Sequence, residues 1–78
     1  MEKSIKNVTI YTQPNCEFCE RAKNLLHSRE EYVIYEIDIS NKPEMKKLVV
    51  ESLGTTVPQI VINGWHIGGY NDLERYLQ

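Results

Sequence analysis

Seven short segments of alternating strand and helix character fill this 78-residue chain, and their order restricts its fold more than any other feature. Strand-like segments alternate β-branched and aromatic residues, whereas helix-like segments repeat apolar residues every three or four positions. The expected strands are residues 8–11, 32–39, 58–62 and 65–67. The expected helices contain Ala22, Leu25 and Leu26, then Met45, Leu48 and Val49, and finally Leu73, Tyr76 and Leu77. The predicted order is therefore β-α-β-α-β-β-α.

Turn and capping signals separate these segments. The expected capping side chains are Asn15 or Cys16 for the first helix, one just ahead of Pro43 for the second, and Asn71 or Asp72 for the third. Gly54 is expected to end the second helix, because glycine readily adopts the left-handed backbone found at helix ends. Asn63 and Gly64 together form a strong hairpin-turn dipeptide.

These connections predict how the strands pair. Strands joined through a helix are expected to be parallel, with right-handed crossovers, and the two strands around Asn63 and Gly64 are expected to be antiparallel. An α/β fold with a four-stranded mixed sheet and helices on both faces follows. Residues 1–78 are expected to form a single domain, since a chain this short has no room for a second core.

Composition and charge exclude several classes of function. The content of 41% hydrophobic and 26% charged residues is ordinary for a globular protein. The net charge is −2 and no basic run stands out, so no nucleic-acid partner is expected. Residues 1–6 lack the apolar stretch of a signal peptide, and no segment has the length of a membrane span. A cytoplasmic location without membrane attachment is therefore expected, where thiols are kept reduced.

Two cysteines, Cys16 and Cys19, lie three positions apart at the junction of a strand and a helix. A Cys-x-x-Cys pair at such a junction is typical of a redox site. The positive end of the helix favours a thiolate on the first cysteine, so Cys16 is expected to be the attacking residue. Cys19, one helical turn further on, can then attack the resulting mixed disulfide and release the substrate.

Two other interpretations of the cysteine pair are weaker. As a structural crosslink it would close a very short loop, which removes little entropy from the unfolded chain. As half of a zinc site it would need further ligands, but the chain has no second cysteine pair. His27 and His66 lack zinc-finger spacing and are expected to be surface or boundary residues. No bound metal is therefore expected.

Glu17 directly follows the attacking cysteine. A carboxylate beside Cys16 opposes thiolate formation and partly offsets the effect of the helix end. The alternative is a solvated acid in the first turn, where it interacts favourably with the helix dipole. The sequence leaves both interpretations open.

Three blocks of the sequence resemble the glutaredoxin family, in the order and at the spacing of that family. They are YTQPNCEFC (residues 11–19), TTVPQIVING (55–64) and HIGGYNDL (66–73). The resemblance covers nearly the whole chain and implies a thioredoxin-like fold. It also implies a glutathione-dependent thiol–disulfide oxidoreductase that reduces protein disulfides and protein–glutathione mixed disulfides, with glutathione as reductant.

The same resemblance implies the remaining site residues. Pro58 is expected to be a cis proline facing the cysteines, and Val57 to offer backbone groups to the cysteinyl part of glutathione. Backbone N–H groups from Gly69 onward can hold the γ-glutamyl carboxylate, and Asp72 can pair with the α-amine. Asn71 and Asp72 can instead simply cap the helix. The full set of expected glutathione contacts is Gln13, Phe18, Thr56, Val57, Pro58, Gly69, Asn71 and Asp72.

The chain departs from the family pattern at three positions. The family commonly has proline and then tyrosine between the cysteines, where this chain has Glu17 and Phe18. A basic residue that can pair with the glycine carboxylate of glutathione is common in the family at the position of Gln13. These departures bear on glutathione affinity and redox potential rather than on the class of reaction.

Two rival functions share the fold and the cysteine pair. One is a glutaredoxin-like electron donor recharged by thioredoxin reductase, with ribonucleotide reductase as a client. The pattern from Gly68 to Asp72 favours glutathione over this rival. The other is a dimer that holds an iron–sulfur cluster between two Cys16 thiolates and two glutathiones, which the absence of the usual proline at Glu17 allows. The expected protein is a monomer that acts on disulfide or glutathionylated clients.

Overall fold

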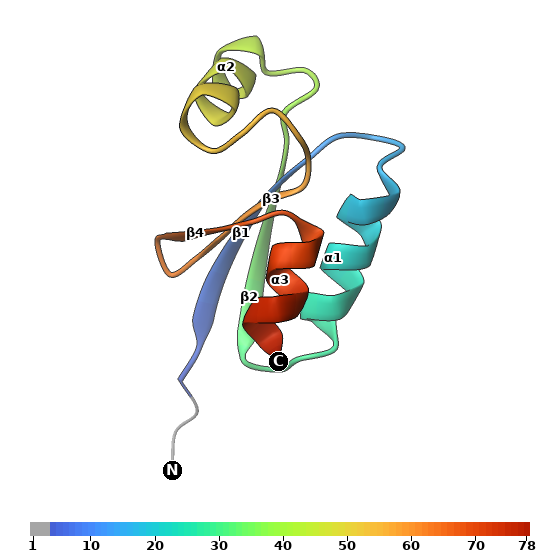
Figure 1. Cartoon of the computed structure of the whole chain (residues 1–78), viewed down its shortest axis with the longest axis vertical. Coiled ribbons are helices and arrows are strands. Elements are labelled where there is room, and N and C mark those ends of the chain that lie inside the picture. The colour runs from blue at the N-terminus through green and yellow to red at the C-terminus, as the bar shows by residue number, and fades with distance from the viewer. Residues whose placement is uncertain (1–3) are drawn as a thin grey trace.

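The computed structural model describes residues 4–78 and contains the seven predicted elements in the predicted order (Figure 1). The elements are β1 (Lys6–Thr12), α1 (Glu17–His27), β2 (Tyr32–Asp38), α2 (Pro43–Ser52), β3 (Gln59–Ile62), β4 (Trp65–Gly68) and α3 (Tyr70–Leu77). The predicted α/β class and the β-α-β-α-β-β-α order are both confirmed.

The four strands form one mixed sheet in the order β2-β1-β3-β4. β1 and β2 are parallel, whereas β3 is antiparallel to both β1 and β4. Asn63 (φ 48°) and Gly64 (φ 85°) both adopt positive φ in the β3–β4 turn, which confirms the predicted hairpin. The prediction that strands joined through a helix are parallel was right for β1 and β2 and wrong for β2 and β3.

The position of α2 explains why β3 runs the other way. Helix α1 carries the chain back along the sheet, so that β2 begins at the same end of the sheet as β1 and runs parallel to it (Figure 1). Helix α2 instead lies beyond the ends of β1 and β2, at the top of Figure 1, so β3 enters the sheet from that end. Helices were predicted on both faces; α1 and α3 share one face, and α2 lies past the end of the sheet.

The hydrophobic core lies between the sheet and the pair α1 and α3. Its fully or almost fully buried residues are Val8, Ile10, Ala22, Leu26, Ile60, Ile62 and Leu73. Burial of each large aliphatic side chain contributes about 1.5–3 kcal/mol, so this layer dominates the stability of the fold. Leu25 and Leu77 pack against the same cluster as predicted, whereas Tyr76 was predicted to face inward and is 44% exposed.

Helix α2 buries much less of its predicted apolar face. Val49 is buried, but Leu48 is 61% exposed. The predicted capping side chain ahead of Pro43 was wrong: the N-cap is Lys42, whose side chain makes no capping bond. The Ser40 hydroxyl donates to Asp38 Oδ1 instead, at 2.6 Å, so it is engaged in the turn that follows β2.

Helix α1 starts at the cysteine pair, and helix α3 starts at the turn that contains Gly68 and Gly69. Cys16 caps α1, as one of the two expected residues, and Asn15 before it adopts a φ of 58°. Gly69, rather than Asn71 or Asp72, is the N-cap of α3. Asp72 contributes from the third helical position, where its carboxylate accepts a hydrogen bond from the Gly69 N–H.

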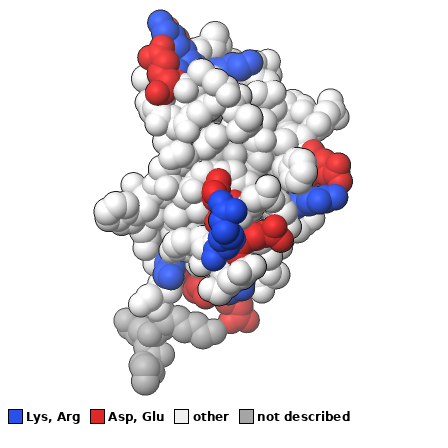
Figure 2. All heavy atoms as spheres, in the orientation of Figure 1, with Lys and Arg blue, Asp and Glu red and all other residues white. Residues whose placement is uncertain are grey.

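Charged side chains of both signs are intermixed on the surface. Figure 2 shows acidic and basic groups next to one another on this face, with wide neutral areas between them. Ion pairs in the structure include Arg21 with Glu17 and Arg75 with Asp72. None of the helices within residues 4–78 has both the length and the apolar character that a membrane span requires.

Candidate active site

The two cysteines lie at the start of α1 and form a disulfide in the structure, with their Cα atoms 5.2 Å apart. Cys16 is the N-cap, and its extended backbone (φ −113°, ψ 105°) directs the side chain back over the first turn. The Cys19 backbone N–H donates to Cys16 Sγ at 3.1 Å. Cys16 is partly exposed and Cys19 is fully buried, so an incoming sulfur can reach Cys16 more readily.

The start of the helix provides the electrostatic environment that a thiolate needs. The Cys19 N–H is one of the backbone donors that have no partner within the helix, and here it is directed at Cys16 Sγ. Such donors and the positive end of the helix stabilise negative charge on sulfur. Glu17 opposes this effect, but Arg21 Nη2 donates to its Oε1 at 2.6 Å. Arg21 therefore offsets part of the Glu17 charge.

The loop before β3 lies opposite the cysteines. The Val57 carbonyl oxygen is 3.8 Å from Cys16 Sγ, although 41 residues separate them in sequence. The peptide bond between Val57 and Pro58 is cis, as expected. A backbone carbonyl close to the reactive sulfur is suited to pair with the backbone of a bound peptide.

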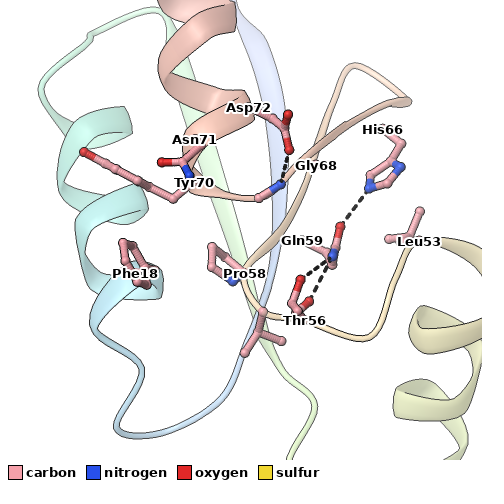
Figure 3. Close-up of a pocket in the computed structure, with 12 residues that line it drawn as sticks. Phe18, Leu53, Thr56, Pro58, Gln59, His66, Gly68, Tyr70, Asn71 and Asp72 are labelled. Atoms are coloured by element: carbon pink, nitrogen blue, oxygen red, sulfur yellow. Dashed lines mark hydrogen bonds between the residues drawn. The ribbon is translucent and has the colours of Figure 1, made fainter.

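A groove of about 490 Å³ runs beside this loop (Figure 3). Its lining residues are Phe18, Leu53, Thr56, Val57, Pro58, Gln59, His66, Gly68, Gly69, Tyr70, Asn71 and Asp72. Seven of the eight expected glutathione contacts are therefore brought together in one place. Gln13 is not among the lining residues, and its contact with glutathione stays a prediction.

Phe18 and Tyr70 form an aromatic wall at one end of the groove. Phe18 is 49% exposed, which shows that it is not a core residue. Its ring centroid lies 5.9 Å from that of Tyr70, and the Arg21 guanidinium lies over the same ring at 5.3 Å. Phe18 therefore contacts both Tyr70 and Arg21, through an aromatic and a cation–π contact.

The turn into α3 forms the next part of the groove. The Gly69 N–H donates to Asp72 Oδ2 at 3.1 Å, and the other oxygen of Asp72 accepts from Arg75. Gly68 has a φ of +122°, and a Cβ at this position would collide with the Asp72 carboxylate. Glycine at position 68 therefore allows the carboxylate to lie against the backbone at the start of α3.

Five groove residues were not among the expected glutathione contacts: Leu53, Gln59, His66, Gly68 and Tyr70. Gly68 and Tyr70 nevertheless lie within the sequence pattern from Gly68 to Asp72 that indicates glutathione. Both histidines are exposed, as predicted, but His66 also bonds to the buried Gln59. A polar residue at the start of the apolar run 58–62 was the available signal for Gln59. Within the part of the chain that the structure describes, no group of three or more His, Cys, Asp and Glu side chains can hold a metal ion.

Comparisons with known proteins agree on one family. The family model described as Glutaredoxin matches residues 8–67. Glutaredoxin 3 of Escherichia coli strain K12 is 44% identical over 68 residues, which cover 86% of this chain and 81% of that protein. The hybrid peroxiredoxin hyPrx5 of Haemophilus influenzae is 41% identical over 71 residues, but the chain spans only 29% of its length.

The fold comparison leads to the same family. The solution structure of a glutaredoxin from Brucella melitensis superposes with a TM-score of 0.76 at 41% identity, covering 96% of this chain and 82% of that one. The chain belongs to the glutaredoxin family: it is a dithiol, glutathione-dependent thiol–disulfide oxidoreductase with a Cys-x-x-Cys active site.

Proposed function

We propose that Cys16 is the attacking cysteine of this glutaredoxin and that Cys19 is the resolving cysteine. The observation that carries the proposal is their difference in exposure, since Cys16 is partly exposed at the helix N-cap and Cys19 is fully buried. The Cys16 thiolate attacks one sulfur of a client disulfide; a mixed disulfide forms and the other client sulfur leaves as a thiolate. Cys19, as a thiolate, then attacks Cys16 Sγ, which releases the client and leaves the Cys16–Cys19 disulfide.

Glutathione returns two electrons to this disulfide. One glutathione thiolate attacks Cys16 Sγ, so that Cys19 leaves as a thiolate and takes up a proton. A second glutathione thiolate attacks the sulfur of the bound glutathione, which frees the Cys16 thiolate and forms oxidised glutathione. Both cysteines are then reduced, and the clients are protein disulfides and glutathionylated proteins.

The groove is the proposed binding site for glutathione. The cysteinyl part would pair with the Val57 backbone beside Cys16, and the γ-glutamyl carboxylate would accept N–H bonds where α3 begins. Asp72 already accepts from Gly69 and Arg75, so the α-amine of glutathione would share a carboxylate that is held in place. The aromatic wall of Phe18 and Tyr70 lines the groove next to this turn.

The roles of the two cysteines predict different losses for two substitutions. Cys16→Ser should abolish all activity, because the attacking sulfur is gone. Cys19→Ser should keep reduction of a glutathionylated peptide, which needs only Cys16 and free glutathione, but should lose most reduction of a protein disulfide. Both activities are measured with glutathione at matched protein concentration. Equal loss of both activities in Cys19→Ser would contradict the assignment.

The proposal extends to the cellular location, the oligomeric state and the metal content of the protein. A cytoplasmic monomer without a resident metal fits a glutathione-linked reductase, since glutathione keeps cytosolic thiols reduced. The iron–sulfur rival requires two copies that share a cluster through Cys16. A colourless protein after anaerobic purification would argue against that rival, whereas a brown protein with visible absorbance would support it.

A further inference from the structure

Gln59 is a buried polar residue that the proposed reaction does not use. It is the first residue of β3 and follows Pro58 directly, and only 5% of its surface is exposed. Both ends of its side-chain amide are engaged: Nε2 lies 2.9 Å from the Thr56 carbonyl oxygen, and Oε1 lies 2.8 Å from His66 Nε2. Figure 3 shows this chain of contacts along the groove.

The chemistry of these contacts fixes the orientation of the amide. A backbone carbonyl oxygen only accepts hydrogen bonds, so the NH₂ end of Gln59 must be the end that faces Thr56. The same NH₂ group lies 3.4 Å from the Thr56 hydroxyl oxygen. The amide oxygen therefore faces His66, and because that oxygen only accepts, His66 must carry a proton on Nε2.

The space around the amide also holds it in place. A Cβ built at Gly54 would lie 2.9 Å from Gln59 Nε2, closer than side chains approach, so glycine leaves room for the NH₂ group. On the other side, the Gln59 backbone pairs in register with Tyr11 of β1. Gln59 is thus anchored to the centre of the sheet, while its side chain reaches the loop before it and the strand after it.

We infer that Gln59 and His66 are positioning residues, which hold the Thr56–Pro58 loop opposite the cysteines. The contacts run from His66 through Gln59 to Thr56, and the next residue, Val57, presents its carbonyl 3.8 Å from Cys16 Sγ. This inference rests on the proposed function, in which the Val57 backbone binds the cysteinyl part of glutathione. Loss of either bond should weaken binding of a glutathionylated substrate more than it slows the chemical step.

The test is the rate of reduction of a glutathionylated peptide by glutathione, measured over a range of peptide concentrations. Gln59→Leu should raise KM roughly tenfold, because it removes both hydrogen bonds, with kcat within about twofold. His66→Leu should raise KM about threefold, because it leaves the Thr56 bond intact. His66→Gln should restore KM to within about twofold, since its amide can donate to Gln59 Oε1.

His27→Leu is the matched control, because His27 is an exposed histidine at the far end of α1 and should leave KM unchanged. Nitrogen NMR of the His66 ring supplies a second readout, which should show the Nε2–H form in the wild type and a mixture of tautomers in Gln59→Leu. If Gln59→Leu does not fold, the comparison of KM between His66→Leu and His66→Gln tests the inference instead.

The inference is overturned if KM stays unchanged in His66→Leu, or if His66→Gln is no better than His66→Leu. It is also overturned if the wild-type ring carries its proton on Nδ1. A wild type that fails to reduce the peptide would instead contradict the proposed function, and the NMR result would still report on the Gln59–His66 bond.

Discussion

Gly68 and Asp72 are linked at the turn into α3. Gly68 adopts a φ of +122°, where residues other than glycine are strained, and a Cβ there would strike the Asp72 carboxylate. The same carboxylate accepts from the Gly69 N–H at 3.1 Å and thereby caps the helix. The backbone conformation at Gly68 and the Asp72 cap of α3 therefore both require a residue without a Cβ at position 68.

Gly68→Ala should accordingly destabilise the protein by about 1–3 kcal/mol, the usual cost of a side chain in a strained backbone region. It should also weaken glutathione binding, because Asp72 must move. The measurement is urea unfolding of the oxidised protein. Gly69→Ala is the control for stability: its φ is negative, and a Cβ there would lie 3.6 Å from the Pro58 carbonyl oxygen, an ordinary contact. Equal stability losses in both variants would contradict this explanation.

The role of Glu17 follows from its contacts in the structure, which its position in the sequence did not settle. The sequence allowed either an effect on Cys16 or a solvated acid in the first helical turn. In the structure its carboxylate pairs with Arg21 at 2.6 Å, and Arg21 also covers the Phe18 ring. The spacing of four residues between Glu17 and Arg21 was visible in the sequence and predicts such a pair. Glu17 therefore supports the wall of the groove through Arg21.

At the scale of elements, an ion-pair network joins α1 to the sheet. Lys23 Nζ contacts Glu20 on its own helix at 2.7 Å and Glu36 on β2 at 3.0 Å. The Thr12 hydroxyl, at the end of β1, donates to the same oxygen of Glu36 at 3.0 Å. Hydrogen bonds to Glu20 and then Glu36 raise the pKa of Lys23 above its ordinary value of 10.5. The charged form of Lys23 is therefore favoured by folding.

This raised pKa predicts how the contribution of Lys23 depends on pH. Folding raises the pKa, so the stabilisation is fully present below about pH 10 and is lost as the pH rises through the folded-state value. Lys23→Met should lower the melting temperature by a few degrees at pH 7, as expected for a networked ion pair. The difference from wild type should shrink above pH 10.5.

Thermal unfolding of both oxidised proteins across this range is the measurement, since the effects of groups that both proteins share cancel in the difference. Lys47→Met, at an exposed position of α2, should show no such pH-dependent difference. A constant difference between Lys23→Met and wild type up to the highest pH would show that packing of the alkyl chain, rather than charge, accounts for the effect.

Most elements could be predicted from local sequence, but their arrangement could not be predicted fully. The N-cap position of Cys16 follows from residues next to it in sequence, so the start of α1 could be predicted. The direction of β3 depends on where α2 lies, which no local pattern reports. Tyr76 has the spacing of a buried residue in α3, yet it is exposed because the core ends at Leu73 and Leu77.

At the scale of the whole molecule, the fold assembles the active site from three distant segments. Phe18 at the start of α1, the loop at 56–58 and the turn at 68–72 line one groove (Figure 3), and Cys16 Sγ lies 3.8 Å from the Val57 carbonyl oxygen of that loop. The resemblance to the glutaredoxin family identifies all three segments from the sequence alone. The bond between Gln59 and His66 was missed, because two single polar residues on adjacent strands have no characteristic spacing.

As a member of the glutaredoxin family, this protein draws its electrons from glutathione. The most direct test follows NADPH oxidation in the presence of a glutathionylated peptide, with either glutathione plus glutathione reductase or thioredoxin reductase alone. Turnover is expected only with glutathione, and the rate should fall to background in Cys16→Ser. Turnover with thioredoxin reductase alone would contradict this expectation, and would mean that the turn from Gly68 to Asp72 does not select glutathione.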